Sequence, residues 1–314
     1  MHSVGDVWLW GVFFTLFLII FGVDFLFVGG RKAHVIQLRE AFLWVTIWAI
    51  CAILFGILIW YHLLPQGAEI AQQKTLEFYT GYIIEQSLSV DNMFVILLIF
   101  QSFAVPARWQ RRVLLWGVLG AVVMRFIFIF AGIGLVTTFH WILYLFGIFL
   151  VWSGVKFFFT PEKIDDPAKN RFVQWLSRHM RVTTQFEGER FFVKQNHFWY
   201  ATPLFLALIL IEFSDLIFAL DSIPAIFAVT LDPFIVVSSN IFAIMGLRAL
   251  FCVVAHSADR FVGLKYGVAL VLILTGSKML VQHWITLPIL PMLLLIVVLL
   301  VGASLIGWFL QKRS

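Results

Sequence analysis

Acidic side chains stand inside otherwise apolar stretches of this sequence, and they are its residues most able to do chemistry. A charged side chain at the centre of a bilayer costs about 2.5–3.5 kcal/mol on insertion scales, so it needs a partner or a function. Two stretches each carry a pair of acids with five residues between them, GYIIEQSLSVDNM and IEFSDLIFALDSIPA. In all, six acids lie inside apolar stretches: Asp24, Glu85, Asp91, Glu212, Asp215 and Asp221.

Basic side chains inside the same stretches are the simplest partners for these acids. They are Arg125, Lys156, Arg248 and Lys278. Pairing with them would occupy up to four of the acids and leave a formal deficit of two negative charges. A divalent cation would balance that deficit, and two protons would balance it equally well, so the residue types leave these explanations open.

The surroundings of the acids favour oxygen ligands over nitrogen or sulfur ligands. The eight histidines lie in loops, tails or at the ends of apolar stretches, and neither Cys51 nor Cys252 neighbours an acidic motif. A site of carboxylates, amides and carbonyls suits hard cations such as Mn²⁺, Mg²⁺ or Ca²⁺ and disfavours Zn²⁺ and Cu⁺. Asn92, Ser222 and Asn240 can supply neutral oxygens, although each is also typical of hydrogen bonds between membrane helices.

The spacing of the paired acids restricts how they can act together. Residues six apart on a straight helix differ by about 120° around the axis and ~9 Å along it, so Glu85 and Asp91 could not both grip one ion from a regular helix. Either the acids form two sites along a path, or the helices are broken near the motifs. Because Pro224 and the polar run 86–89 permit a break, we expect broken helices.

The apolar stretches predict an all-α, polytopic membrane helix bundle that forms a single transmembrane domain over residues 1–314. Of the 314 residues, 62% are hydrophobic and 12% are charged, against about 25% charged in an ordinary soluble domain. These values exclude a soluble protein, a disordered chain and a disulfide scaffold. About nine transmembrane helices are expected: Trp8–Val28, Phe42–Leu63, Glu77–Phe103, Val113–Gly134, Phe139–Phe159, Thr202–Val229, Pro233–Ala255, Tyr266–Gln282 and Pro288–Leu310.

The distribution of positive charge predicts the orientation of these spans. The net charge is +5, but 17 of the 22 Lys and Arg residues fall in loops on one side, whereas Lys74 alone falls on the other. Because cytoplasmic loops are enriched in Lys and Arg, the N-terminus is expected outside and the C-terminus in the cytoplasm. Since the basic residues are explained by this topology, nucleic acid is not an expected partner. The 160–200 segment is then a cytoplasmic loop, in which Asp166-Pro167 predicts a short helix on the membrane surface. A docking or regulatory role for this loop is the alternative.

An internal repeat relates residues 77–159 to residues 202–282. Each copy contains three spans, an odd number, so the two copies must cross the bilayer in opposite directions. Inverted repeats are typical of secondary transporters, whose binding site lies near the midplane where the repeats meet. A duplicated bundle without transport is the alternative. After the acid pairs, the matching features are Arg125 and Arg248, then Ser153-Gly154-Val155-Lys156 and Thr275-Gly276-Ser277-Lys278.

Two longer segments, GYIIEQSLSVDNMFV and LIEFSDLIFALDSIPAIFAVT, resemble the signature stretches of the TerC family of integral membrane proteins. SNIFAIMGLRAL and LKYG add to the resemblance, and ATPLFLALILIE is similar to the Alx branch of that family. The resemblance implies a bacterial inner-membrane protein linked to manganese export and to tellurite resistance, with some members supplying metal to enzymes outside the membrane. It also implies that the metal is bound by the matching acids, Glu85, Asp91, Glu212, Asp215 and Asp221.

The favoured hypothesis is a secondary transporter, not an enzyme, that exports Mn²⁺ from the cytoplasm in exchange for protons and has no resident cofactor. The resemblance selects manganese and the outward direction, because the residues alone do not separate Mn²⁺ from Ca²⁺. Asp24 would attract the ion near the cytoplasmic end. The other polar residues inside spans would support or gate the site: Asn92, Arg125, Lys156, Ser222, Asn240, Arg248 and Lys278.

Two other functions compete with transport. A membrane factor that delivers metal or confers tellurite resistance without moving ions is the main alternative. An intramembrane aspartyl protease that uses Asp91 and Asp221 is a remote one, because the chain lacks a GxGD segment and a protease does not need five acids.

Overall fold

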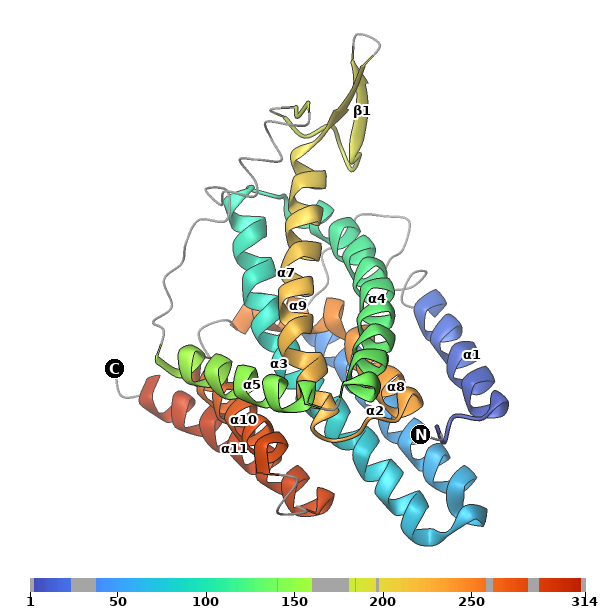
Figure 1. The fold of residues 1–314 in the computed structure, drawn as a ribbon. Coiled ribbons are helices and arrows are strands. Elements are labelled where there is room, and N and C mark those ends of the chain that lie inside the picture. The colour runs from blue at the N-terminus through green and yellow to red at the C-terminus, as the bar shows by residue number, and fades with distance from the viewer. Residues whose placement is uncertain are drawn as a thin grey trace.

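The computed structural model is a bundle of helices with one β-hairpin at one end (Figure 1). It describes residues 3–23, 38–139, 141–159, 181–183, 185–195, 198–257, 262–281 and 288–311. This architecture confirms the prediction of an all-α, polytopic membrane protein. The helices are α1 (Val7–Val23), α2 (Leu38–Leu63), α3 (Ala68–Ser102), α4 (Ala107–Thr138), α5 (Ile142–Phe159), α7 (Pro203–Phe227), α8 (Pro233–Met245), α9 (Leu247–Ser257), α10 (Val262–Val281) and α11 (Ile289–Gln311), with a 3₁₀ turn at Leu64–Gln66.

In the described part of the chain, fewer helices than the nine predicted are long and apolar enough to count as membrane spans. Six helices among the described residues are long and apolar enough to cross a bilayer, and α8 with α9 makes a seventh if the bent pair is one span. The shorter apolar helices α1 and α10 account for the difference. The predicted end of the first span, Val28, lies outside the described residues. The count of nine is therefore not confirmed.

The helices expose apolar side chains and bury polar ones, which is the reverse of a soluble bundle. Leu18, Ile127 and Val298 are each more than half exposed. Glu85, Arg125 and Asn240, in contrast, are buried between helices. Such a surface is stable against lipid tails, and these three buried side chains bind one another inside the protein.

Four helices surround the buried polar groups. α3 packs against α7 and α8, and α4 packs against the same two helices. A cluster of aromatic rings joins α1 and α2 to this unit, with Phe55 lying 4.7 Å from Phe242 and 5.5 Å from Phe78 between ring centroids. Large buried rings such as these fix the helices around the polar centre.

α5 and α10 form a tight pair, with α11 beside α10 (Figure 1). Three glycines allow the close approach, because a Cβ added at Gly147, Gly154 or Gly276 would lie 3.0 Å or less from backbone oxygen of the other helix. Gly154 and Gly276 occupy matching positions of the proposed repeat, and α3 and α7, which carry the acid pairs, also pack together. These pairings agree with the inverted repeat of residues 77–159 and 202–282, which stays a prediction.

α3 and α7 pass through both acidic motifs without a break, so the prediction of broken helices there is wrong. α3 is continuous over 35 residues, and α7 is continuous with Pro224 inside its last turn. Pro224 has no backbone N–H to donate, and because it stands three residues before the end of α7, this loss does not interrupt the helix at the acidic motif. The break occurs instead at Gly246, where α8 and α9 meet at a bend of 46°, two residues before Arg248.

The hairpin of β1 (Phe192–Gln195) and β2 (Phe198–Ala201) lies within the segment predicted as a loop. Its antiparallel register pairs Phe192 with Ala201 and Gln195 with Phe198. It projects beyond the helices at the end where α7 begins (Figure 1). The surface helix predicted after Asp166-Pro167 lies outside the described residues.

Candidate functional site

Arg125 of α4 is the centre of a buried polar cluster, with a carboxylate from each of two other helices. Its Nη1 donates to Glu85 of α3, and its Nη2 donates to Asp215 Oδ1 of α7 at 3.1 Å. Nε of the same guanidinium lies 3.5 Å from Asp215 Oδ2. The three residues are 0–4% exposed. Ion pairing, one of the explanations left open by the sequence, therefore accounts for two of the buried acids.

Two asparagines complete this Arg125 cluster. Asn240 of α8 accepts from Arg125 Nη1 at 3.1 Å and donates to Glu85 Oε2 at 3.1 Å. Asn92 of α3 donates to Asp215 Oδ1 at 2.9 Å, while its own Oδ1 is buried without a hydrogen-bond partner among the described residues. The cluster thus joins four helices and carries one more negative than positive charge. An unpaired oxygen and a negative charge are features that a cation can use.

Glu212 lies one helical turn before Asp215 on α7, and its carboxylate rests against Gly120 of α4. It is partly exposed, whereas Asp215 is buried. Residues three apart share a helix face, so the two carboxylates follow one another along the α4–α7 interface.

Asp221 lies apart from the Arg125 cluster, at a second place. Its Oδ1 accepts from Ser153 Oγ of α5 at 3.0 Å, and Lys156 lies within electrostatic reach. All three border a cavity of about 240 Å³, whose other walls come from α3 and α10. Of the two arrangements considered from the sequence, unbroken helices favour two places along a path over one shared site.

The remaining predicted site residues are spread over several helices. Arg248 of α9 is buried, and Ser222 of α7 is buried with its Oγ unpartnered among the described residues. Lys278 of α10 is buried within electrostatic reach of Glu77. Asp91 lies on α3, but its side chain is outside the described part of the structure, as is the whole of Asp24.

No three acidic, histidine or cysteine side chains lie close enough to hold one metal ion, within the part of the chain that the structure describes. Glu85 and Asp215 instead bind different nitrogens of Arg125. A single centre built from all five acids is therefore not assembled in this conformation. The assignment of those acids as metal ligands stays a prediction.

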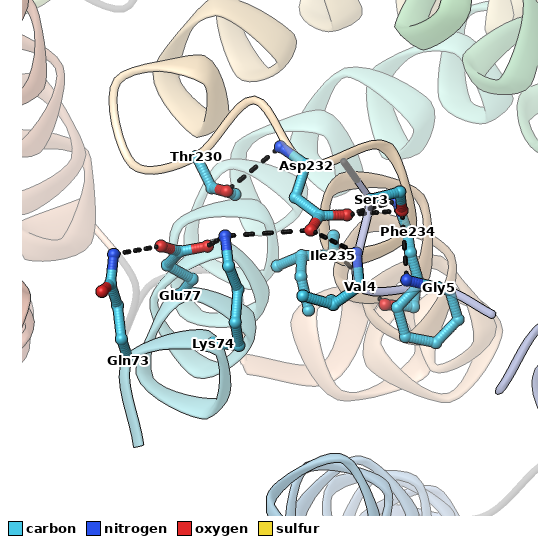
Figure 2. Close-up of polar contacts among 11 residues, drawn as sticks. Ser3, Val4, Gly5, Gln73, Lys74, Glu77, Thr230, Asp232, Phe234 and Ile235 are labelled. Atoms are coloured by element: carbon cyan, nitrogen blue, oxygen red, sulfur yellow. Dashed lines mark hydrogen bonds and ion pairs between the residues drawn. The ribbon is translucent and has the colours of Figure 1, made fainter. Parts of the chain in front are cut away.

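A further polar cluster, which sequence reasoning missed, joins the start of α3 to the start of α8 (Figure 2). Lys74 Nζ lies 2.8 Å from Glu77 Oε2 and 3.8 Å from Asp232 Oδ2. Asp232 caps α8 by accepting from Phe234 N, and it also accepts from Ser3 Oγ at 2.9 Å. Two signals in the sequence could have found it: the i, i+3 spacing of the opposite charges Lys74 and Glu77, and Asp232-Pro233 as the start of a helix.

Comparison with known proteins gives the family of the chain. Residues 70–314 match the family described as the integral membrane protein TerC family. A Salmonella typhi relative, whose name describes a membrane-bound redox modulator, Alx, is 49% identical over 290 residues, which cover 92% of this chain and 90% of the relative. The Escherichia coli K12 protein of that name is 48% identical over the same shares. An uncharacterized membrane protein of Myxococcus xanthus, STKORF319, is 43% identical over 99% of this chain and 95% of the relative. No solved structure matches. The chain belongs to the TerC family of integral membrane proteins.

Proposed function

We propose that this protein is a secondary transporter that exports Mn²⁺ from the cytoplasm of a bacterium in exchange for protons. In this proposal the protein lies in the inner membrane with its N-terminus outside and its C-terminus in the cytoplasm. The observation that carries the proposal is the pair of carboxylates, Glu85 and Asp215, buried on two different helices and bound to one guanidinium of a third.

Arg125 binds the carboxylates of Glu85 and Asp215 in this conformation, in the position that the transported cation would occupy. The guanidinium neutralises one of the two negative charges of Glu85 and Asp215 while no metal is bound. A divalent cation that reaches the cluster competes with Arg125 for the same carboxylate oxygens. Asn92 Oδ1, buried without a partner among the described residues, adds a neutral oxygen of the kind that Mn²⁺ accepts.

Protons can replace the metal ion on the same carboxylates. A carboxylate that loses its cation inside the bilayer is stable only when it is protonated or paired again. Asp221, with Ser153 at the second place, gives the ion another carboxylate along the way. Asp91, Ser222 and Arg248 are proposed to act elsewhere along the same path. Rocking of one repeat against the other would open the two places to opposite sides in turn.

The test is uptake of Mn²⁺ into everted membrane vesicles with and without an imposed proton gradient. We expect gradient-stimulated uptake by the wild type and its loss in Glu85→Gln, Asp215→Asn and Asp221→Asn. Glu189→Gln is the matched control, because Glu189 is an exposed acid whose partner is the surface residue Arg112. Competition with Ca²⁺ and Mg²⁺ ranks the ions. Correctly inserted wild type that takes up no more Mn²⁺ than empty vesicles would contradict transport and favour a metal-delivery role.

A further inference from the structure

Gly120 of α4 provides a niche for the carboxylate of Glu212. A Cβ built on Gly120 would lie under 3.0 Å from the carboxylate carbon and both carboxylate oxygens, a separation that real Cβ atoms essentially never show. The carboxylate therefore occupies the space that any side chain at position 120 would fill.

The neighbouring glycine of α4 shows that this niche is local. A Cβ at Gly117, one turn earlier on the same helix, would meet Ile211 Cγ2 at 3.4 Å, which is an ordinary van der Waals contact. The close fit at Gly120 thus involves the carboxyl group of Glu212, whereas the other close glycine of the α4–α7 interface, Gly132, meets the ring of Phe227.

The niche lies between the hairpin end of the bundle and the Arg125 cluster. α7 begins at Pro203, directly after β2, so Glu212 precedes Asp215 along the path from that end. At a rise of about 1.5 Å per residue, the two positions are ~4.5 Å apart along the helix axis. Glu212 is partly exposed, and Asp215 is buried and bound to Arg125. A cation that moves from the hairpin end toward Arg125 meets Glu212 first.

We infer that Gly120 is a positioning residue of the transport path. Because it has no side chain, the Glu212 carboxylate fits between α4 and α7, where it binds the cation before the cation moves to Asp215. The inference rests on the proposed function, which it extends by giving the path a first carboxylate on the hairpin side and a residue that fixes its place.

The nature of the obstructing atoms makes the inference testable without unfolding the protein. At Gly120 they are the far end of a flexible side chain, so Gly120→Ala displaces the carboxylate and leaves the helices in place. At Gly154 they include backbone atoms of α10, which cannot swing away. Glu212→Asp shortens the side chain by one methylene, so combining it with Gly120→Ala restores room for both groups.

The experiment compares Mn²⁺ uptake into everted vesicles by the wild type, Gly120→Ala, Gly117→Ala, Glu212→Asp and the double variant Gly120→Ala/Glu212→Asp, at equal amounts of inserted protein. Each single change at the niche should lower the initial rate by about tenfold to 100-fold, the loss expected when a reacting group is displaced by about 1 Å. Gly117→Ala should keep the wild-type rate. The double variant should be no slower than Glu212→Asp alone, because the shortened side chain leaves room for the Cβ at position 120.

The outcomes separate this inference from the proposed function. Uptake by the wild type with an unaffected Gly120→Ala variant would overturn the inference alone. A double variant clearly slower than Glu212→Asp alone would also overturn it, because packing between the helices, and not the position of the carboxylate, would then explain the loss in Gly120→Ala. A wild type without uptake would overturn the proposed function and the inference with it.

Discussion

Glu85 and Asp215 bind the same guanidinium through different nitrogens, Nη1 and Nη2 of Arg125. The two acids stand at matching positions of the proposed repeat, on α3 and α7. One cation on α4 therefore links the two halves of the bundle at a buried point. Separating α3 from α7 would leave at least one of the two buried carboxylates without its cation, which is costly inside a protein.

Removal of the guanidinium should be strongly destabilising. Arg125→Ala leaves two buried carboxylates without their cation, and breaking a buried pair in this way costs about 3–5 kcal/mol. Arg125→Lys should fall between Ala and wild type, since an ammonium keeps the charge but not the planar set of donors. Thermal unfolding in detergent measures both. Arg112→Ala, which removes a half-exposed ion pair with Glu189, is the control and should cost at most about 1 kcal/mol; equal losses at the two arginines would refute the prediction.

Asn240 should matter more than its buried neighbour Ser238. Asn240→Ala removes one donor to Glu85 and one acceptor from Arg125, and unpaired buried groups cost about 1–3 kcal/mol each. Ser238→Ala removes only a hydroxyl that donates to Ile235 O of its own helix, so we expect a change below about 1 kcal/mol. Thermal stability of the two variants in the same detergent gives the comparison. Equal stability would mean that Asn240 does not support the ion pair.

Asp232 should hold the N-terminal segment against the bundle (Figure 2). Asp232→Ala loses the cap of α8, worth about 0.5–2 kcal/mol, and also the acceptors for Ser3 Oγ and Val4 N. We expect faster protease cleavage near residue 5 in right-side-out vesicles, which expose the N-terminus in the proposed orientation. Asp232→Asn keeps one oxygen acceptor and should give an intermediate rate. Unchanged cleavage in the Ala variant would show that other contacts secure the segment.

The α5–α10 pair should not tolerate side chains at its glycines. A Cβ at Gly154 would lie 2.7 Å from Ala269 O, and one at Gly276 would lie 2.7 Å from Gly147 O. Either Ala variant forces the helices apart and should lower the melting temperature. Gly134→Ala on α4 is the control: a Cβ there meets nothing within 4 Å, so the change should be neutral or stabilising by up to about 1 kcal/mol. A neutral Gly154→Ala would contradict the close packing.

Much of the helical architecture could be predicted from apolar run lengths, because lipid allows few alternatives to a helix for a spanning segment. The predicted second span, Phe42–Leu63, ends at the same residue as α2, Leu63. The 35-residue length of α3 was not predicted, since its first turns, from Ala68, are polar and carry no apolar signal. The hairpin was missed for a related reason. Its aromatic residues next to Asn196-His197 are typical of strands, but they lay in a segment taken as a loop because it separates two long apolar runs.

The candidate site could be predicted as a set of residue types, but not as a set of contacts. Position in apolar stretches was enough to single out Glu85, Asp215 and Arg125. Periodicity does not specify which acid faces which base, because that depends on how the helices turn toward each other. Asp221 therefore turned out to bind Ser153, a residue that the repeat had marked only as part of a matching tetrapeptide. The niche at Gly120 depends on a missing atom, and no pattern of polar residues reveals it.

The hairpin is a suitable binding site for an antibody fragment, because it projects beyond the helices (Figure 1) and is attached to them. The segment that precedes β1 is fixed to α4 by the Trp109–Phe186 ring contact and the Arg112–Glu189 ion pair, and β1 itself is fixed to α7 by Phe192 against Phe205. An antibody fragment bound to β1 and β2 would therefore be attached, through these contacts, to α4 and α7, the helices that carry Arg125 and Asp215. On a 36.1 kDa chain whose helices a detergent micelle would cover, such a fragment would give cryo-electron microscopy a rigid fiducial outside the micelle. Its effect on Mn²⁺ uptake would report directly whether α4 and α7 must shift against each other.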